Sequence, residues 1–388
     1  MHKQIKIICK NSTKESYANF TLTTQKIYTV YMYNIKLIDI FANSRYNITK
    51  YEIGVEFMEV FPTVSVVIPI HNEERYIEAC LDSLLNQDYP MNLVEAILVD
   101  GMSTDSTRSI IEEKYTSKYS FIKMIDNPEK SVQYALNYGI KAAKNEYIVR
   151  FDAHSEYATD YISKCIEYHL KTDADNIGGP NIVMGKTPVQ KAIAAAYYSS
   201  FALGGGRNHI EGYEGYSDTV SFGSFLRSTA EKLNYFDEDL TLNEDDDFNF
   251  RLIEQGGKVY ITPEIRSTYY PRDNYRALFK QYYLYGLWKV AVIKKHKKPA
   301  RLSHLVPLLF FMFVTFGAVL SLFVPYFKYL YLTVLALYIT IDFVVSFKSK
   351  YIDTKIGHLR LVWIHFILHF SYGLGFFVGL FKFGFKKW

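Results

Sequence analysis

Two residues with metal-binding side chains, Asp152 and His154, stand two positions apart directly after an apolar run at 147–151. Side chains at positions i and i+2 of extended backbone point to the same side, so both can reach one cation. One carboxylate and one imidazole suit Mn²⁺ or Mg²⁺ when the phosphate oxygens of a ligand complete the coordination shell. The ion would then neutralise a departing diphosphate group. The pair predicts a divalent cation site, although the spacing alone is also found at ordinary polar strand ends.

A second acidic group, Glu244–Asp247, opens a predicted helix over 245–254. The helix dipole favours acidic residues at a helix N-terminus, which is one explanation of the run. Four consecutive carboxylates exceed what capping requires, so one of them is a candidate general base for an acceptor hydroxyl. Crowding by like charges raises the pKa of a carboxyl group and brings it closer to the working pH.

Alternating strands and helices are predicted to position these groups. Runs of β-branched residues indicate strands, and apolar stripes of helical period indicate the segments between them. The expected strands are 64–70, 94–99, 121–125 and 147–151, and the expected helices are 74–87, 105–115 and 131–144. Such alternation is typical of an α/β fold with a mostly parallel sheet and helices on both faces. In these sheets ligands bind at the carboxyl ends of the strands.

Polar residues stand at the ends of the first two expected strands. Asp100 closes the second strand and Glu73 follows the first, and each could accept hydrogen bonds from a base or a ribose hydroxyl. Asp105 is expected to cap the next helix and Asn72 to shape a turn, which does not compete with a ligand role for Asp100. The first strand is not followed by a glycine-rich phosphate loop, which argues against a dinucleotide oxidoreductase and an ATPase.

The composition changes near residue 304, beyond which the chain is almost continuously apolar. Segments 305–327, 329–347 and 361–381 are each near the roughly 20 residues needed to cross a bilayer core. Basic residues precede the first segment and separate the second from the third, which favours a cytoplasmic catalytic part. A third crossing would put a C-terminus with three lysines outside. We interpret the last segment as interrupted by its glycines at 373, 375 and 379. It therefore either spans the membrane or is a re-entrant or interfacial segment.

Bulk properties exclude several classes of protein. A chain with 49% hydrophobic and 22% charged residues is not disordered, and a formal net charge of +4 gives no reason to expect a nucleic-acid partner. Aromatic residues make up 17%, a high share that is typical of contact with lipid or sugar. Cys9, Cys80 and Cys165 provide neither a disulfide framework nor a zinc motif, which fits a reducing compartment.

The domain organisation has four parts. Residues 1–57 show no clear periodicity and no signal-peptide pattern, which leaves two alternatives open: a disordered extension, or an untranslated stretch before a start at Met58. A catalytic domain is expected at 58–270. An amphipathic region at 271–303 contains an expected membrane-surface helix over 274–296. Membrane segments occupy 304–388. Gln281 and Trp288 on the amphipathic helix either close over the site or have no catalytic role.

These motifs together resemble the inverting family 2 glycosyltransferases with the GT-A fold. The matching stretches across about 64–290 are VSVVIPIHNEERYIEACLDSLLNQDYP, ILVDGMSTDSTRSII, YIVRFDAH and NEDDDFNFRLIEQGG. Within the family, VDGMSTD, RFDAH, QYYLYGLWK and HFSYGLGFFVGL are most similar to the succinoglycan-biosynthesis-type enzymes. Those enzymes add one sugar to a polyprenyl-diphosphate-linked oligosaccharide.

The resemblance implies a nucleotide-binding set, a metal-binding pair and a base. The nucleotide-binding set is Pro69, Asn72, Glu73, Asp100, Arg150 and Asp152. Asp152 and His154 would bind the cation, Mn²⁺ or Mg²⁺, together with the diphosphate, and Asp245 would be the base. Glu244 is a candidate on the acceptor side, with Gln281 and Trp288. The expected reaction is a single displacement at the anomeric carbon, which inverts its configuration.

Three departures from the family pattern bear on these expectations. His154 stands where many members have a second Asp, which leaves the metal preference open. Processive synthases carry a Q-x-x-R-W motif, whereas here Leu284 occupies the arginine position and Trp288 is displaced, which argues for transfer of a single sugar. Residues 204–209, GGGRNH, stand where an acceptor loop is expected, with a plain linker as the alternative.

The resemblance therefore implies a glycosyltransferase attached to the cell membrane by several passes, with a cytoplasmic catalytic domain. It would move a sugar from a nucleotide sugar, expected to be UDP-linked, to a polyprenyl-diphosphate-linked oligosaccharide. Two alternatives stay open. One is a polyprenyl-phosphate glycosyltransferase, whose acceptor is the lipid phosphate, and the other is a membrane protein that binds nucleotide sugars without turnover.

Overall fold

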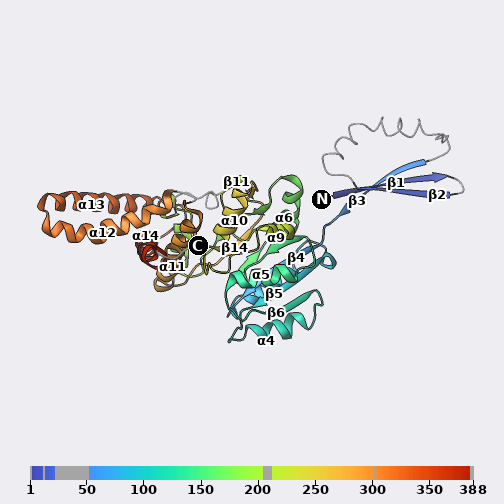
Figure 1. Cartoon of the computed structure of the whole chain (residues 1–388), viewed down its shortest axis with the longest axis horizontal. Coiled ribbons are helices and arrows are strands. Elements are labelled where there is room, and N and C mark those ends of the chain that lie inside the picture. Colours follow the sequence, from blue (N-terminus) through green and yellow to red (C-terminus); the bar gives the residue numbers. More distant parts are fainter. Residues whose placement is uncertain (1, 12–13, 22–51, 204–211, 300–301, 385–388) are drawn as a thin grey trace.

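The computed structural model describes residues 2–11, 14–21, 52–203, 212–299 and 302–384. Three parts follow one another along the long axis of the molecule: an N-terminal sheet, an α/β domain and a module of long helices (Figure 1). The predicted α/β class, with a mostly parallel sheet and C-terminal apolar helices, is confirmed.

Four parallel strands form the half of the central sheet that carries the polar motifs. In spatial order they are β6 (Ile122–Asp126), β5 (Val94–Asp100), β4 (Val64–Ile70) and β7 (Tyr147–Arg150). Apolar helices cover both faces of these strands, which explains why their sequences are continuous apolar runs rather than alternating ones. The strands predicted from those runs are confirmed to within one residue at each end.

Short strands complete the sheet and form a second one beside it. The remaining strands of the eight-stranded sheet are β12 (Ser224–Leu226), β9 (Asn176–Gly178), β13 (Val259–Ile261) and β11 (Gly215–Ser217). The second sheet contains β8 (Ser155–Tyr157), β14 (Ser267–Tyr269) and β10 (Asn181–Val183). Because β8 begins just after His154, this small sheet forms one wall beside the predicted metal pair.

Two layers of helices enclose the central sheet. One face packs against α3 (Ile77–Leu85), α4 (Thr107–Ile111, continued by a turn at Glu112–Thr116) and α6 (Tyr161–Lys171). The other face packs against α5 (Val132–Ala142), α9 (Arg227–Lys232) and α10 (Glu244–Glu254). A short 3-10 turn at Met91–Leu93 leads into β5.

The N-terminal sheet projects from the α/β domain (Figure 1). Its strands are β1 (His2–Asn11), β2 (Lys14–Thr21) and β3 (Glu52–Val60), all antiparallel, with β1 in the middle. Strands form here although the sequence shows no clear periodicity, and β3 runs through Met58.

The helical module combines two helices that precede β11 in the sequence with four that follow β14. It contains α7 (Pro188–Tyr197), α8 (Ser200–Leu203), α11 (Tyr275–His296), a 3-10 turn (Leu302–Leu305) that leads into α12 (Val306–Phe323), α13 (Pro325–Phe347) and α14 (Lys355–Gly384). Within the described part of the chain, three helical stretches are long and apolar enough to cross a membrane: 302–323, 325–347 and 355–384. The predicted segments 329–347 and 361–381 lie within the last two, whereas 305–327 runs past the end of α12 into the start of α13.

The prediction that glycines interrupt the last segment is wrong, because α14 runs unbroken through all of them. They instead permit close helix packing. A Cβ atom on Gly375 would lie 1.9 Å from the carbonyl oxygen of Tyr283 in α11, and one on Gly373 would lie 2.1 Å from that of Pro307 in α12. Backbone atoms cannot rotate out of the way as a side chain can, so these positions require glycine.

Replacing Gly375 with Ala should therefore loosen α14 from α11. We expect a loss of roughly 2–3 kcal/mol of stability, as for overpacking in a core, measured as a lower Tm of the detergent-solubilised chain. Gly384→Ala in the same helix is the matched control, because a Cβ atom there has nothing within 4 Å. An equal Tm for the two variants would contradict the packing role of Gly375.

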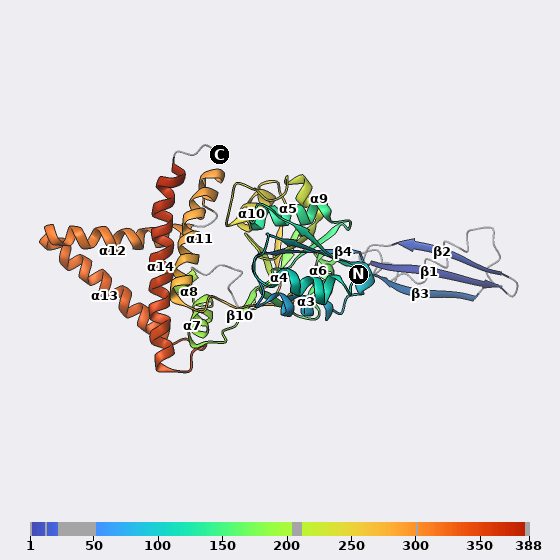
Figure 2. The same cartoon turned by 90° about the horizontal axis from the view of Figure 1, so that it is seen from below.

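The expected membrane-surface helix at 274–296 exists as α11, but it is covered on both sides. On one side the amide of Asn243, which precedes α10, donates to the carbonyl of Tyr285 at 3.2 Å. On the other side α11 and α14 pack along their length, with Gly286 and Gly375 at the contact. Of the two helices, α14 is therefore the one farther from the α/β domain (Figure 2).

Candidate functional site

The loops that follow β4 and β5 are bonded into one unit. Asn72, whose φ of 56° lies in the left-handed region that Asn tolerates, donates from its backbone N–H to the Ser103 hydroxyl at 2.8 Å. Its side-chain oxygen accepts from the Thr104 backbone N–H, also at 2.8 Å. The backbone N–H of Glu73 donates to the Thr107 hydroxyl at 2.8 Å. These bonds hold the two loops together at the carboxyl edge of the sheet. Pro69, the last residue but one of β4, lies at the same edge.

Asp100 is fully buried, and its two carboxylate oxygens are bonded within the protein. One accepts from the Ser103 hydroxyl at 2.6 Å, and the other accepts from the Ser103 backbone N–H at 3.0 Å and from the Arg108 guanidinium at 2.7 Å. Asp105 accepts from the Thr107 backbone N–H at 3.1 Å. The N-cap of α4 is however Ser106, so the predicted capping position of Asp105 is one residue too early. Asp100 thus organises the loop at the predicted nucleoside position.

Arg150 at the end of β7 joins the two acidic motifs. Its buried guanidinium donates from Nε to Asp152 at 2.9 Å, from Nη1 to Asp245 at 2.6 Å and from Nη2 to Glu244 at 3.2 Å. The predicted metal ligand and the predicted base are therefore held by one side chain. Every nitrogen of the guanidinium faces a carboxylate. Arg150 is expected in the nucleotide-binding set, and these three contacts with acidic side chains are not part of that expectation.

The structure divides the acidic run at the start of α10 into two pairs with different partners. Glu244 and Asp245 face Arg150, whereas Asp246 and Asp247 face α11. Asp246 pairs with Lys289, and Asp247 lies 2.7 Å from Lys295 and 2.8 Å from His296. Half of the run therefore attaches α11 to the α/β domain, and the other half belongs to the predicted site.

Asp245 and Asp247, one from each pair, also differ in proton affinity. Burial by itself would raise the pKa of Asp247, but the hydrogen bond from His296 and the charges of Arg251 and Lys295 lower it to about 2. Burial raises the pKa of the Asp245 carboxyl well above its ordinary value, and the nearby Glu244 and Asp152 charges add to this effect against the opposing charge of Arg150. A raised pKa makes Asp245 a better proton acceptor than Asp247.

His154 lies opposite Glu73, with 3.3 Å between His154 Nδ1 and the nearer carboxylate oxygen. Burial lowers the pKa of the imidazole, but the hydrogen bond to Glu73 and the Asp152 charge outweigh that effect and raise it. The His154 ring also packs edge-on against Tyr269, whose hydroxyl accepts from the Gln281 amide at 3.3 Å. Glu73 and Gln281 are thus both connected to the predicted metal pair.

Trp288, the other candidate for closing the site, lies elsewhere. Its ring packs on Phe383 of α14, with 5.0 Å between ring centroids, and Lys382 lies over it. This placement does not support a closing role. The candidate acceptor loop at 204–209 lies outside the described residues.

The residues at the strand ends fit a cation that shares its ligands with a bound diphosphate. Across the described residues, no group of three or more His, Cys, Asp and Glu side chains could hold a metal ion by itself. Asp152 and His154 offer an oxygen and a nitrogen donor, and Mg²⁺ or Mn²⁺ commonly combines such a short protein set with substrate phosphates. Three carboxylates around one guanidinium also leave an excess of negative charge that a divalent cation would balance.

Sequence reasoning missed Arg272, which follows β14. Its charge is close enough to lower the pKa of His154, and its side chain is exposed. The antiparallel pairing of β14 with β8, in which Tyr269 lies opposite Ser155, brings it there. An isolated arginine in a loop has no local pattern that distinguishes it, so only the fold could identify this residue.

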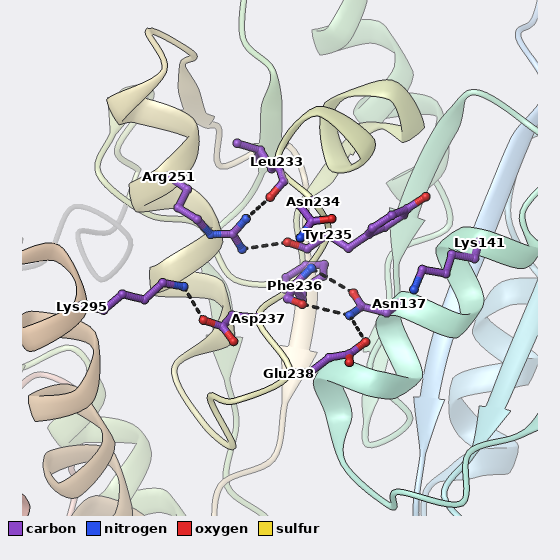
Figure 3. Close-up of a pocket in the computed structure, with 10 residues that line it drawn as sticks. All are labelled: Asn137, Lys141, Leu233, Asn234, Tyr235, Phe236, Asp237, Glu238, Arg251 and Lys295. Carbon is purple, nitrogen blue, oxygen red and sulfur yellow. Dashed lines mark hydrogen bonds and ion pairs between the residues drawn. The ribbon is translucent and has the colours of Figure 1, made fainter. Parts of the chain in front are cut away.

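A cavity of about 570 Å³ lies away from this cluster and includes none of the predicted site residues (Figure 3). Its polar side chains bond to one another and to the loop at 233–238. Arg251 donates to the Tyr235 carbonyl at 2.8 Å, Asn137 donates to that of Phe236 at 2.9 Å, and Lys295 pairs with Asp237. We interpret the cavity as a structural junction rather than a ligand site.

Comparison with known proteins gives concordant results. Residues 65–233 match the family model described as glycosyl transferase family 2. The chain is 35% identical over 240 residues to a dolichyl N-acetyl-alpha-D-glucosaminyl phosphate 3-beta-D-2,3-diacetamido-2,3-dideoxy-beta-D-glucuronosyltransferase of Methanococcus voltae, covering 60% of this chain and 74% of that protein. It is 32% identical over 260 residues to the succinoglycan biosynthesis protein ExoA of Rhizobium meliloti, covering 66% and 78%.

A solved structure has the same fold. It is that of the mannosyltransferase PcManGT from Pyrobaculum calidifontis in complex with GDP-Man and Mn²⁺, which superposes with a TM-score of 0.52 at 16% sequence identity. The superposition covers 83% of this chain and 88% of that one.

Proposed function

The chain belongs to glycosyl transferase family 2 and is a glycosyltransferase, and we propose that it moves one sugar from a nucleotide sugar to a lipid-linked saccharide at the membrane. The observation that carries this proposal is the Arg150 cluster. The buried Arg150 guanidinium donates to Asp245 at 2.6 Å and also to Asp152, so one side chain positions both the proposed base and the proposed cation ligand.

Within this proposal each residue has a distinct task. Asp245 accepts the proton of the attacking acceptor hydroxyl as that oxygen bonds to the anomeric carbon and the nucleoside diphosphate leaves, with inversion. Asp152 and His154 would hold a divalent cation, Mn²⁺ or Mg²⁺, which supplies charge neutralisation to the leaving diphosphate. Arg272 is placed to add a positive charge on the same side. Asn72, Glu73 and Asp100 shape the nucleoside position.

The lipid-linked acceptor is supported by two observations. The names of the Methanococcus and Rhizobium relatives refer to a dolichyl phosphate-linked sugar and to succinoglycan biosynthesis. The apolar helices of this chain would bring the catalytic domain to a bilayer, where such an acceptor is found. The more specific acceptor, a polyprenyl-diphosphate-linked oligosaccharide, and the UDP-linked donor are carried over from the sequence expectation. The cation is also expected from the Mn²⁺ complex of PcManGT.

The test is a transfer assay with membranes that contain the full chain. Radiolabelled UDP-sugars and GDP-sugars are offered with either a polyprenyl-diphosphate-linked saccharide or a polyprenyl phosphate, with and without a chelator. We expect cation-dependent labelling of the lipid-linked saccharide, with the label released by mild acid as part of an oligosaccharide. Release as a free monosaccharide from the polyprenyl phosphate would instead identify a polyprenyl-phosphate glycosyltransferase. Absence of transfer from every donor, with UDP binding intact, would contradict enzymatic function.

A further inference from the structure

The three apolar helices do not form a parallel bundle. Figure 2 shows α11 and α14 side by side, and the hairpin of α12 and α13 extending from α14 on the side away from the α/β domain, with α12 crosswise to α14 and α13 oblique to it. In Figure 1 the same hairpin lies across the view while α14 is seen nearly end-on. The long axis of the hairpin therefore runs across that of α14.

The side-chain contacts agree with this crossing. Among the described residues, ring contacts from α12 to α14 end at Phe316, which packs against Phe377. Contacts from α13 to α14 involve its second half, beginning at Tyr338. The two hairpin helices also pack on each other, as the rings of Phe313 and Tyr331 do. The outer half of the hairpin therefore extends past α14.

Length and exposure separate the hairpin from α14. The two hairpin stretches have 22 and 23 residues, and at 1.5 Å per residue each is about 33 Å long, enough for a hydrocarbon core of about 30 Å. Only 11% of the most apolar stretch of each is buried, against 50% for α14. The hairpin thus exposes a larger share of its apolar surface than α14 does, as lipid-embedded helices do, whereas α14 has one side on protein.

Charges mark the two ends of the hairpin differently. The basic residues at the base or along α14 are Lys294, Lys295, Lys348, Lys350, Lys355, Arg360 and Lys382. The tip has one cation, Lys328, beside the exposed Tyr326 and Tyr329. Basic residues favour the cytoplasmic side and tyrosines favour an interface, so the base is cytoplasmic and the tip lies at the opposite surface.

Polar groups in the middle of α14 argue against a third crossing. His365 Nδ1 lies 2.6 Å from Asp342, and His369 Nδ1 lies 2.9 Å from the Tyr338 hydroxyl. In a spanning α14 both histidines would lie near the bilayer centre, where ionisable groups are costly. Asp342 is five residues before the basal end of α13, about 8 Å along the helix, so in the crossed arrangement the pair is close to the headgroups.

We propose that the α12–α13 hairpin alone crosses the bilayer and that α14 lies in the plane of the membrane surface on the catalytic side. In this arrangement α14 separates α11 from the lipid, and its exposed Trp363 and Phe381 enter the headgroup layer. Lys382, near the end of α14, is then on the same side as the other basic residues.

Impermeant maleimide labelling tests the proposal on the full chain in sealed right-side-out vesicles, with detergent-permeabilised vesicles for comparison. Single cysteines are placed at Tyr326 in the tip, Lys382 near the end of α14 and Lys118 in the catalytic domain, in a Cys9→Ser background. Cys80 and Cys165 are buried, so their lack of reaction also reports a folded domain. We expect Tyr326→Cys to react in sealed vesicles, and Lys382→Cys and Lys118→Cys to react only after permeabilisation.

Two outcomes would overturn the proposal. Reaction of Lys382→Cys in sealed vesicles would mean that α14 crosses, and protection of Tyr326→Cys would mean that the hairpin does not. Nitroxide labels at Ile356, Trp363 and Leu380 of α14 add a measurement of depth by power saturation. An in-plane helix gives them similar shallow depths, whereas a spanning helix gives depths that differ by more than about 10 Å. Neither measurement requires turnover, so failure here is distinguishable from failure of the proposed activity.

Discussion

Asp245→Asn should lower kcat for sugar transfer about 10³-fold while donor binding in the presence of Mn²⁺ stays within about threefold of the wild type. General-base catalysis contributes roughly 10²–10⁴-fold, and an amide cannot accept the proton of the acceptor hydroxyl. A 10³-fold loss corresponds to about 4 kcal/mol of transition-state stabilisation. The amide oxygen can still accept the hydrogen bond from Arg150, so the cluster keeps its shape. Initial rates with radiolabelled donor and calorimetric titration with UDP measure the two quantities.

Asp152→Asn is the matched comparison, because it alters another carboxylate of the same cluster. This variant should lose Mn²⁺-dependent affinity for UDP at least tenfold, since an amide is a poorer ligand for a divalent cation. The two variants thus separate base from cation ligand. If Asp245→Asn kept full activity, or if Asp152→Asn bound UDP with unchanged dependence on Mn²⁺, the corresponding assignment would be refuted.

Arg150→Met should destabilise the chain by about 3–5 kcal/mol and abolish transfer. The guanidinium is buried among three carboxylates, and removing one partner of a buried ion pair leaves uncompensated charge. Thermal unfolding of the detergent-solubilised chain measures the stability. Arg266→Met is the control, because Arg266 lies 3.5 Å from Asp160 at the surface and should contribute less than about 1 kcal/mol.

A second substitution keeps this prediction testable if Arg150→Met is poorly folded. Adding Glu244→Gln removes one of the stranded charges, so the double variant should regain part of the lost stability. It should not regain activity, because Asp245 and Asp152 still lack their common anchor. Arg150→Lys should fold better than Arg150→Met but remain at least tenfold less active, since a single ammonium cannot engage three carboxylates in fixed directions. Recovered activity in the double variant would contradict the anchoring role.

Much of the fold follows from local patterns. The buried strand at 64–70 is a run of β-branched residues, and such a run is readable without any knowledge of its neighbours. The placement of Asp152 after a strand end follows from the general rule for parallel sheets. The contact between Arg150 and Glu244 joins residues 94 positions apart, and no local period encodes it. The acidic run at the start of α10 could likewise be found, but its division between Arg150 and α11 depends on which elements pack on each side.

The glycines of α14 show a different limit. In sequence, Gly375 weakens the prediction of a helix, because glycine costs roughly 1 kcal/mol relative to Ala there. The structure uses the same residue to bring two backbones together. The sequence contains the residue but not the neighbour that explains it.

The attachment of α11 to Asp246 and Asp247 has a consequence for the reach of the enzyme. Asp245 immediately precedes Asp246 in the same helix, so the ion pairs with Lys289 and Lys295 fix the position of the proposed base relative to α11. If α14 lies on the lipid as proposed, the elevation of the base above the bilayer is a constant of the protein. The hydroxyl of a lipid-anchored acceptor would then reach Asp245 only when the saccharide between the lipid and that hydroxyl has the matching length. The fixed distance between Asp245 and the bilayer would therefore select acceptors by the length of their saccharide.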